Sequence, residues 1–383
     1  MVLRNTWLQK INQLWSERSL IWLSGVRRSG KTVLCQSISD MEYFDCDLPS
    51  VRERLRDPES FLRSMLNKKV IIDEIHRLDN PSELLKIAAD HFPGIKIIAT
   101  GSSTLGASAK FRDTLTGRKR ELWLTPMTLN DASDFNLMDL DHRLHFGGLP
   151  PFFLKKAQPQ QDFQEWMDSY WAKDIQELFR IERKFSFSRF AELLFVQSGS
   201  AFEASRFATP CEVSRSTISN YLALLEATYV AHIIRPFNTR MSKEIVAIPR
   251  VYTFDTGFVA YYNGWRELRS EDIGLLWEHY VLNDMMAALQ TRDINYWRDK
   301  EDHEIDFVIR QRTGHTITIE CKTSARKFDG YNLSFFRKRY PEGKNFVVCT
   351  DIVNAFDQSF RGNLVRFVGL NDLIKELKKE ANP

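Results

Sequence analysis

The chain has 383 residues, of which 43% are apolar and 27% are charged, so it is long enough for two or three packed domains and too apolar for general disorder. Its formal net charge of +3 is too small to identify a polyanionic partner, so any argument for nucleic-acid binding has to rest on local sites. The five cysteines are scattered without a CxxC pair and no apolar run approaches the roughly 18 residues that span a bilayer, which favours a cytoplasmic protein without disulfides or membrane contact.

The first motif lies near the amino terminus, in residues 18–38. An apolar run, RSLIWL, precedes SGVRRSGKT, and VLCQSI follows it, which predicts a strand, a glycine loop and a helix. The spacing GxxxxGK[ST] lets main-chain N–H groups surround phosphates, while the lysine reaches the terminal phosphates and the threonine hydroxyl binds magnesium. The alternative is a glycine-bearing turn with an incidental lysine. We expect ATP contacts from Gly25, Arg28, Ser29, Gly30, Lys31, Thr32 and Val33.

An acidic pair, Asp73 and Glu74, follows a second apolar run in KKVIIDEIHRL. Asp73 is expected to hold magnesium together with Thr32, and Glu74 to orient and deprotonate the water that attacks the γ-phosphate. An acidic pair after a strand is also common as a solvated turn. The glycine loop upstream favours the catalytic interpretation.

Two further polar positions complete the predicted nucleotide site. The run GIKIIATGSST predicts a strand with a polar end, where Ser102 would contact the γ-phosphate, although small polar residues also form ordinary turns. In LTGRKRELWLTPMT, Arg118 is the candidate for stabilising transition-state charge, in its own subunit or in a neighbour's site. The alternative for Arg118 is a solvated basic turn.

The order GVRRSGKT, VIIDEIHRL, IIATGSS, LTGRKRELWLTPMT and GGLPPFF resembles the bacterial and archaeal AAA-type ATPases that carry a carboxy-terminal domain of uncertain role. The paired arginines Arg27 and Arg28 are typical of that group. The resemblance covers nearly the whole chain. It implies ATP binding and hydrolysis on an α/β sheet with helices on both faces, and by analogy a possible homo-oligomer.

The middle of the chain is predicted to be helical from residue 130 to about 185 and then to contain a winged helix. In EVSRSTISNYLALLEATYVAHIIRPF, an amphipathic helix begins at a Ser/Thr-rich turn and is followed by a β-rich run. Ser214, Arg215, Ser219 and Asn220 would face DNA. Basic residues are sparse here, so a protein contact or a purely architectural role stays open.

In the last part, Asp306 and Glu320 lie on neighbouring predicted strands, Lys322 shares a face with Glu320, and Glu278 lies on the preceding helix. This arrangement resembles the core of metal-dependent nucleases of the restriction-enzyme type, PD-(D/E)xK. Asp306 and Glu320 would then bind magnesium, Lys322 would position the attacking water, and Glu278 would complete the site. The usual proline is replaced by Ile305, and His279 stands where many members of the resembled family have asparagine, which leaves a partial degeneration of this site open. The alternative is a set of ion pairs on a wet sheet face.

These elements predict an α/β chain with an AAA-type P-loop domain at residues 1–150, a helical linker with a winged helix at 151–245, and a nuclease-like domain at 246–383. ATP and Mg²⁺ are the expected cofactors and DNA the expected partner. The first hypothesis is an ATPase coupled to DNA processing. The second is an ATP-dependent switch or assembly protein whose nuclease-like domain binds a partner without cutting.

Overall fold

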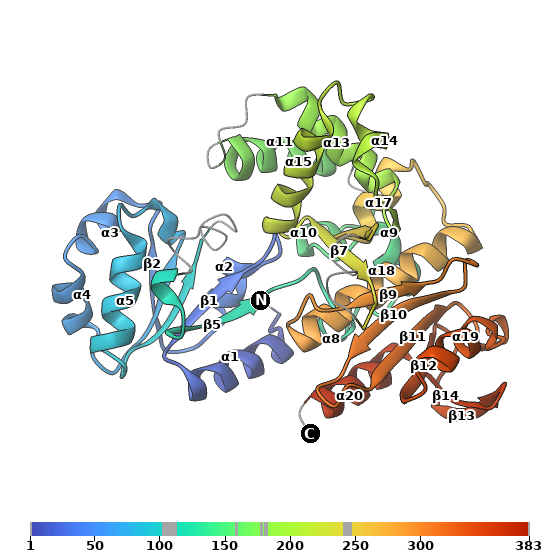
Figure 1. Ribbon diagram of the computed structural model, residues 1–383. Coiled ribbons are helices and arrows are strands. Elements are labelled where there is room, and N and C mark those ends of the chain that lie inside the picture. Colours follow the sequence, from blue (N-terminus) through green and yellow to red (C-terminus); the bar gives the residue numbers. More distant parts are fainter. Residues whose placement is uncertain are drawn as a thin grey trace.

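The computed structural model describes residues 2–101, 113–157, 160–176, 179, 183–239 and 247–381. Two β-sheets lie side by side, one built from the first third of the chain and one from its carboxy-terminal part, with the helices of residues 160–227 above them (Figure 1). No described helix is both long enough and apolar enough to cross a membrane.

The first sheet has five strands in the order β2-β3-β4-β1-β5, and all neighbouring strands are parallel. The strands are β1 (Leu20–Ser24), β2 (Met41–Asp45), β3 (Lys69–Asp73), β4 (Lys96–Thr100) and β5 (Lys119–Trp123). The strands expected from RSLIWL, KKVIID and GIKIIAT are therefore confirmed. Their nearly continuous apolar sequences are typical of parallel strands, which are buried on both faces.

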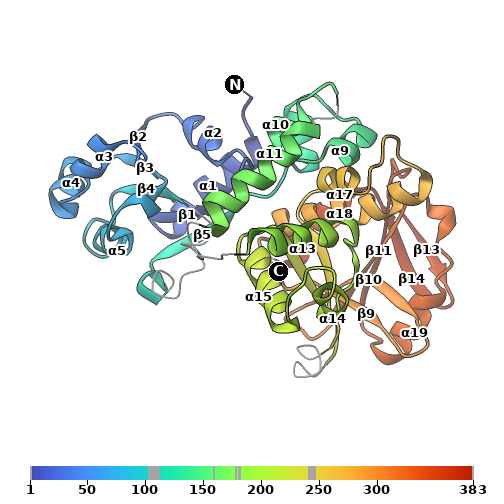
Figure 2. The ribbon, with the colours of Figure 1, turned by 90° about the horizontal axis from the view of Figure 1, so that it is seen from above.

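Helices cover both faces of this sheet. They are α1 (Asn5–Glu17), α2 (Lys31–Gln36), α3 (Pro49–Arg54), α4 (Pro58–Ser64) and α5 (Pro81–His91), with a short 3₁₀ turn η1 (Ile75–Arg77). Side chains alternate along β1, so Trp22 packs in the same apolar cluster as residues of α4 and α5, while Ile21 packs in the same cluster as residues of α1. Figure 2 shows the sheet between these helices.

The strand order places three loops at one edge of the first sheet. Because β4 lies between β1 and β3 and all three run in the same direction, their carboxyl ends meet at that edge. The glycine loop after Ser24, the carboxylate of Asp73 and the hydroxyl of Thr100 are brought together there. This edge is where ligands bind in open parallel sheets.

The middle of the chain is mostly helical, as the sequence predicted. Its elements are α8 (Leu129–Asp134), α9 (Leu140–Phe146), α10 (Pro150–Phe153), α11 (Gln160–Tyr170), the π-helix η2 (Trp171–Gln176), α13 (Lys184–Val196), β6 (Ser200–Ala201), α14 (Ala204–Ala208), α15 (Arg215–Ala227), β7 (Ala231–Pro236), β8 (Arg250–Thr253) and α17 (Thr256–Tyr262). Aromatic rings fill the core of this part, and Trp166 lies against Tyr170, Phe254 and Phe258.

The second sheet has nine strands in the order β13-β14-β12-β11-β10-β9-β7-β8-β6. Its carboxy-terminal elements are α18 (Ser270–Leu289), β9 (Asn295–Arg298), β10 (Glu304–Arg310), β11 (Thr316–Lys322), η3 (Ala325–Lys327), α19 (Tyr331–Arg339), β12 (Gly343–Cys349), β13 (Phe356–Phe360), β14 (Asn363–Val368) and α20 (Leu370–Ala381). β10 pairs antiparallel with β11, and β7 pairs parallel with β9. The domain boundary expected at residue 245 falls between β7 and β8 in the chain. Both strands belong to this same sheet.

Candidate functional site

The glycine loop joins β1 to α2 in a conformation that its two glycines permit. Gly25 has φ +145° and Gly30 has φ +95°, values that side-chain-bearing residues rarely adopt. A Cβ atom on Gly25 would lie 2.3 Å from the carbonyl oxygen of Leu124. The glycine at each position is thus required by backbone shape, as a phosphate-binding loop requires.

Lys31 is the first residue of α2, and its side chain folds back over the loop. Its Nζ donates hydrogen bonds to the carbonyl oxygens of Gly25, at 2.9 Å, and Val26, at 3.1 Å. Burial lowers the pKa of this ammonium group, which the carboxylates of Glu74 and Asp174 partly oppose. Within the described part of the chain the hydrogen-bond partners of this ammonium group are main-chain carbonyl oxygens, so it is suited to receive an anion.

Thr32 and Asp73 form the second element of the site. The Thr32 hydroxyl donates a hydrogen bond to Asp73 Oδ2 at 2.9 Å, and the Tyr43 hydroxyl reaches the same oxygen at 2.5 Å. Thr100 donates to the other carboxylate oxygen. A hydroxyl beside a buried carboxylate is an oxygen donor set of the kind that magnesium prefers, so these two residues fit a magnesium ion.

Glu74 follows in a left-handed conformation, with φ +51°. Its Oε2 lies 3.2 Å from His76 Nδ1. The hydrogen bond from His76 lowers the pKa of Glu74, although burial partly opposes this effect. Glu74 is therefore a carboxylate near neutral pH, which is the form needed to accept a proton from water.

A pocket of about 340 Å³ opens beside the loop. Its lining includes residues of the loop and α2, among them Lys31 and Thr32, together with Glu74, His76 and Gly101, whereas Asp73 does not line it. Pro151, Lys173 and Asp174, from segments beyond the first sheet, also line the pocket.

The π-helix η2 contacts the glycine loop through a direct ion pair. Arg27 Nε lies 2.7 Å from Asp174 Oδ2, and the Trp166 indole N–H donates to the Arg27 carbonyl oxygen at 3.1 Å. Burial raises the pKa of Asp174, while Arg27 opposes that shift. The sequence analysis missed Asp174 and Lys173, because no local pattern marks residues that reach the site through tertiary contacts. It also gave no role to His76, although this residue follows Glu74 by only two positions.

The other predicted nucleotide contacts divide into two groups. Arg28 and Val33 line the pocket, whereas the Ser29 side chain is fully buried and does not line it. Arg118 is not among the residues lining the pocket, and its Nε pairs with Asp90 Oδ1 at 2.7 Å. Ser102 falls outside the described residues.

A second cluster lies on β10 and β11, where Asp306, Glu320 and Lys322 come together as the sequence predicted. Lys322 Nζ lies 2.7 Å from Glu320 Oε2 and 3.4 Å from Asp306 Oδ2, and the Cys321 main-chain N–H donates to Asp306 Oδ2 at 2.7 Å. Burial, followed by the charge of Asp306, raises the pKa of Glu320 to about 8. The ammonium group of Lys322 therefore does not offset the combined effect of burial and the neighbouring carboxylate on the pKa of Glu320.

Glu278 of α18 is held by residues of β8. The Tyr252 hydroxyl donates to Glu278, and Arg250 lies 3.8 Å from Glu278 and 2.5 Å from Glu304. Burial, together with the charge of Asp306, raises the pKa of Glu278 to about 7.

Glu278 does not join Asp306 and Glu320 in a compact ligand set. Within the described ranges, the group of three acid or histidine side chains with ligand atoms all within 4.8 Å is Asp299, Glu301 and His303, in the turn before β10. Asp306 and Glu320 fit a divalent cation as a pair. The third acid, Glu278, instead lies 3.8 Å from Arg250. His279 is buried against Ser198 Oγ at 2.6 Å and does not contact the carboxylates.

The residues predicted to face DNA lie at the start of α15. Ser214 caps the helix through the Thr217 N–H at 3.1 Å, and Ser214, Arg215, Ser219 and Asn220 are all exposed.

Comparison with known families assigns the first part of the chain. Residues 17–132 match the AAA domain family, residues 137–269 match a domain of unknown function (DUF8612), and residues 273–365 match a further domain of unknown function (DUF4143). Residues 17–132 include the loop, Asp73 and Glu74. The protein therefore carries an AAA-type ATPase domain of the P-loop kind.

Relatives are similar over most of the chain. Uncharacterized proteins of Mycobacterium tuberculosis and Mycobacterium bovis are each 26% identical over 319 residues, covering 80% of this chain and 70% of theirs. A Walker-type ATPase of Pyrococcus abyssi aligns with a TM-score of 0.44 and 15% identity, over 68% of this chain and 96% of that one. RuvB of Thermotoga maritima aligns with a TM-score of 0.31 and 16% identity, over 64% and 95%.

Proposed function

We propose that this protein binds ATP with Mg²⁺ and hydrolyses it at the edge of the first sheet. The observation that carries the proposal is the contact between Thr32 and Asp73 at 2.9 Å, directly beside a glycine loop with Lys31 at its end. A hydroxyl from the loop helix and a buried carboxylate from another strand meet where a metal-bound triphosphate requires them. The AAA-type domain match over residues 17–132 supports the same activity.

Each residue has a distinct part in this proposal. Main-chain N–H groups of the loop and the amino terminus of α2 bind the phosphates, and Lys31 exchanges its carbonyl partners for terminal phosphate oxygens. Thr32 and Asp73 would hold a magnesium ion, which would supply positive charge to the triphosphate. Glu74 accepts the proton of the attacking water, after turning from His76 toward the γ-phosphate.

Arg118 has a role in this proposal only if a second subunit provides the site. Its guanidinium pairs with Asp90 and it is absent from the lining of the described pocket of its own chain. A neighbour's γ-phosphate would have to replace Asp90 as its partner, so homo-oligomerisation is part of the proposal for Arg118 alone.

For the carboxy-terminal part, we propose that nucleotide turnover is coupled to DNA through a nuclease-like cluster. The two carboxyl groups of Asp306 and Glu320 share Lys322, which is the residue set that metal-dependent phosphodiester cleavage uses. In this proposal Lys322 neutralises the phosphate or orients the attacking water. The strand and helix order of residues 184–253, with β6-β8-β7 pairing, supports a winged helix whose exposed α15 end approaches DNA.

A specific observation favours the second candidate, a switch that binds a partner without cutting. Tyr252 donates a hydrogen bond to Glu278 and Arg250 lies 3.8 Å from it, so the third acid already has partners within the protein. An arginine at that point competes with a divalent ion for the same carboxylate. In that case the cluster would stabilise the second sheet and present its surface to a partner.

One experiment separates these candidates. ATP hydrolysis is measured with and without single-stranded, duplex and branched DNA, and each DNA is examined on a gel in the same reaction. Cleavage that requires magnesium and disappears in Asp306→Ala, with ATP turnover retained, supports the nuclease. Wild-type protein that hydrolyses ATP but cuts no DNA form supports the switch, and protein that does not hydrolyse ATP contradicts both.

A further inference from the structure

We propose that Arg4, outside the glycine loop, is a positioning residue of the ATP site. It holds the Ser29–Gly30 peptide so that the Gly30 N–H faces the bound phosphates. This inference rests on the proposed ATP binding and adds a residue that precedes the first helix and belongs to no phosphate-binding motif.

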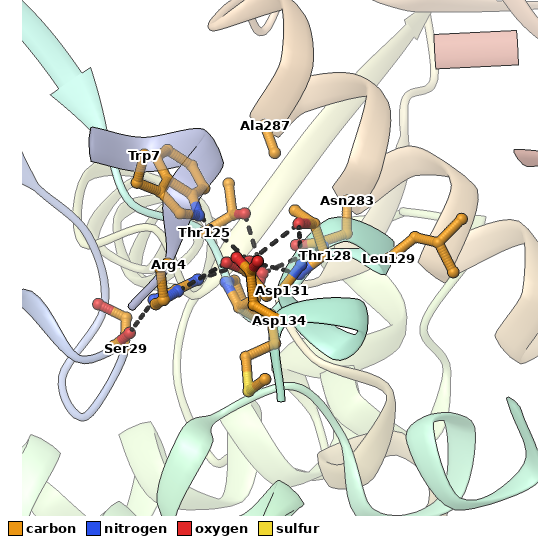
Figure 3. Close-up of polar contacts among 12 residues, drawn as sticks. Arg4, Trp7, Ser29, Thr125, Thr128, Leu129, Asp131, Asp134, Asn283 and Ala287 are labelled. Carbon is orange, nitrogen blue, oxygen red and sulfur yellow. Dashed lines mark hydrogen bonds and ion pairs between the residues drawn. The ribbon is translucent and has the colours of Figure 1, made fainter. Parts of the chain in front are cut away.

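Arg4 contacts the loop directly. Its Nη1 donates a 2.9 Å hydrogen bond to the main-chain carbonyl oxygen of Ser29, and the arginine is only 5% exposed (Figure 3). The two residues are 25 positions apart in the chain. The contact lies outside the pocket, because neither Arg4 nor Ser29 is among the residues that line it, whereas Gly30 lines it.

The geometry of a peptide unit converts this contact into an effect on the pocket. In a planar trans peptide the C=O of one residue and the N–H of the next point in opposite directions. A Ser29 carbonyl that is held toward Arg4 therefore directs the Gly30 N–H away from Arg4, toward the pocket side. Such an N–H donor contributes to phosphate binding only while it keeps this orientation.

Because residue 30 is a glycine, the orientation of the Ser29–Gly30 peptide depends on a contact that holds it. Its φ of +95° lies in a region that only glycine adopts easily, and glycine also permits many other backbone conformations. The Ser29–Gly30 peptide can therefore rotate at small cost if nothing holds its carbonyl. The Arg4 contact selects one of these conformations.

Arg4 is itself fixed by a buried anchor. Its Nε and Nη2 donate to the two oxygens of Asp131, both at 2.8 Å, in a two-point contact. Asp131 is fully buried, and it also accepts hydrogen bonds from the Trp7 indole at 3.1 Å and the Thr128 main-chain N–H at 2.9 Å (Figure 3). The third guanidinium nitrogen is thereby directed at the loop.

This use of three nitrogens makes arginine specific for the position. A lysine has one ammonium nitrogen and cannot hold both oxygens of Asp131 and the Ser29 carbonyl in the same planar arrangement. Arg4→Lys keeps the positive charge beside Asp131, so it removes the positioning contact with the least damage to the buried pair. It is the informative variant.

The test follows magnesium-ADP binding to the full chain by titration and by NMR. Serine labelled with ¹³C at its carbonyl and glycine labelled with ¹⁵N together mark the Ser–Gly peptides, which are those of Gly25, Gly30 and Gly199. Arg337→Lys is the matched control, because Arg337 is also 5% exposed and also binds a main-chain carbonyl, that of Lys344, in the second sheet. Asp131→Asn, which weakens the anchor, replaces Arg4→Lys if that variant does not fold.

We expect Arg4→Lys to bind magnesium-ADP on the order of tenfold more weakly than wild type. At saturation, the Gly25 signal should shift as in wild type, while the Gly30 shift should be lost, and Arg337→Lys should behave as wild type in both respects. A folded Arg4→Lys variant with unchanged affinity and an unchanged Gly30 shift overturns the role of Arg4. A wild-type protein that binds no magnesium-ADP overturns the proposed function instead.

Discussion

Thr32 and Asp73 are 41 residues apart in the chain, and the Thr32 hydroxyl donates a 2.9 Å hydrogen bond to Asp73 Oδ2. The contact joins the first turn of α2 to the carboxyl end of β3. Asp73 keeps Tyr43 and Thr100 as further partners, so its position does not depend on Thr32 alone. The threonine hydroxyl is therefore available to a metal ion without disrupting the carboxylate.

Thr32→Val should impair the response to magnesium more than the fold. Valine has nearly the same shape but no hydroxyl, so one ligand of the metal is lost. We expect the magnesium concentration that gives half-maximal ATP hydrolysis to rise about tenfold, from the loss of roughly 1.4 kcal/mol, with an unchanged melting temperature. Magnesium titrations at fixed ATP measure this, and an unchanged midpoint would contradict the role of Thr32.

Glu74→Gln should separate binding from hydrolysis. The amide has the same size as the carboxylate but cannot accept a proton from water, so turnover should fall by about 10²–10⁴-fold while ATP affinity changes little. Phosphate release and nucleotide titration measure the two quantities. If hydrolysis stays within a few-fold of wild type, the base is another residue.

Arg250→Gln should increase the affinity of the second cluster for a divalent ion. Arg250 lies 3.8 Å from Glu278 and 2.5 Å from Glu304, and its removal leaves these carboxyl groups without their cation. We expect Mn²⁺ to bind about tenfold more tightly, a gain of about 1.4 kcal/mol, because Glu278 and Glu304 no longer have a cation of the protein beside them. Manganese titration monitored by electron paramagnetic resonance measures this effect, with the Arg250→Gln, Asp306→Asn double variant as the control. Equal affinity with and without Arg250 would show that it does not compete with a metal.

His232 should make the protein less stable in mild acid. It is buried on β7, and burial, followed by the charges of Arg292 and His279, lowers its pKa to about 3. Because the unfolded chain takes up the proton near pH 6.5, the stability from neutral His232 is complete above that pH and is lost as the pH falls toward 3. The loss between pH 7 and pH 5 amounts to about 2 kcal/mol.

Denaturant unfolding at pH 7 and pH 5 measures this loss, and a His232→Asn variant is the comparison. The variant should lose about 2 kcal/mol less than wild type over the same interval. Parallel pH dependences of the two proteins would mean that His232 is protonated as readily in the folded state as in the unfolded chain.

The sequence predicted the elements whose signals are local. Gly25, Gly30, Lys31 and Thr32 lie within eight consecutive residues, so the glycine loop could be predicted from a single short motif. The apolar runs before this loop and before Asp73 are short and bounded by polar residues, so the strands could be predicted from the same local sequence. The meeting of Asp306, Glu320 and Lys322 was predicted from the same kind of local alternation.

Contacts that depend on tertiary packing could not be predicted in this way. Arg27 meets Asp174 across 147 residues and Arg4 meets Asp131 across 127 residues, and nothing in their neighbouring sequence marks these pairs. The strand β13, FDQSF, is exposed along most of its length at the edge of the second sheet and lacks the apolar alternation by which strands are recognised.

The central claim is that magnesium-bound ATP is held by the glycine loop, Lys31 and Thr32, and its most direct test is ATP hydrolysis by wild type and Lys31→Ala. The account predicts phosphate release by the wild type that stops when magnesium is chelated, and none above background from the variant, with both proteins unfolding at the same temperature. Undiminished phosphate release from a folded Lys31→Ala protein would contradict it.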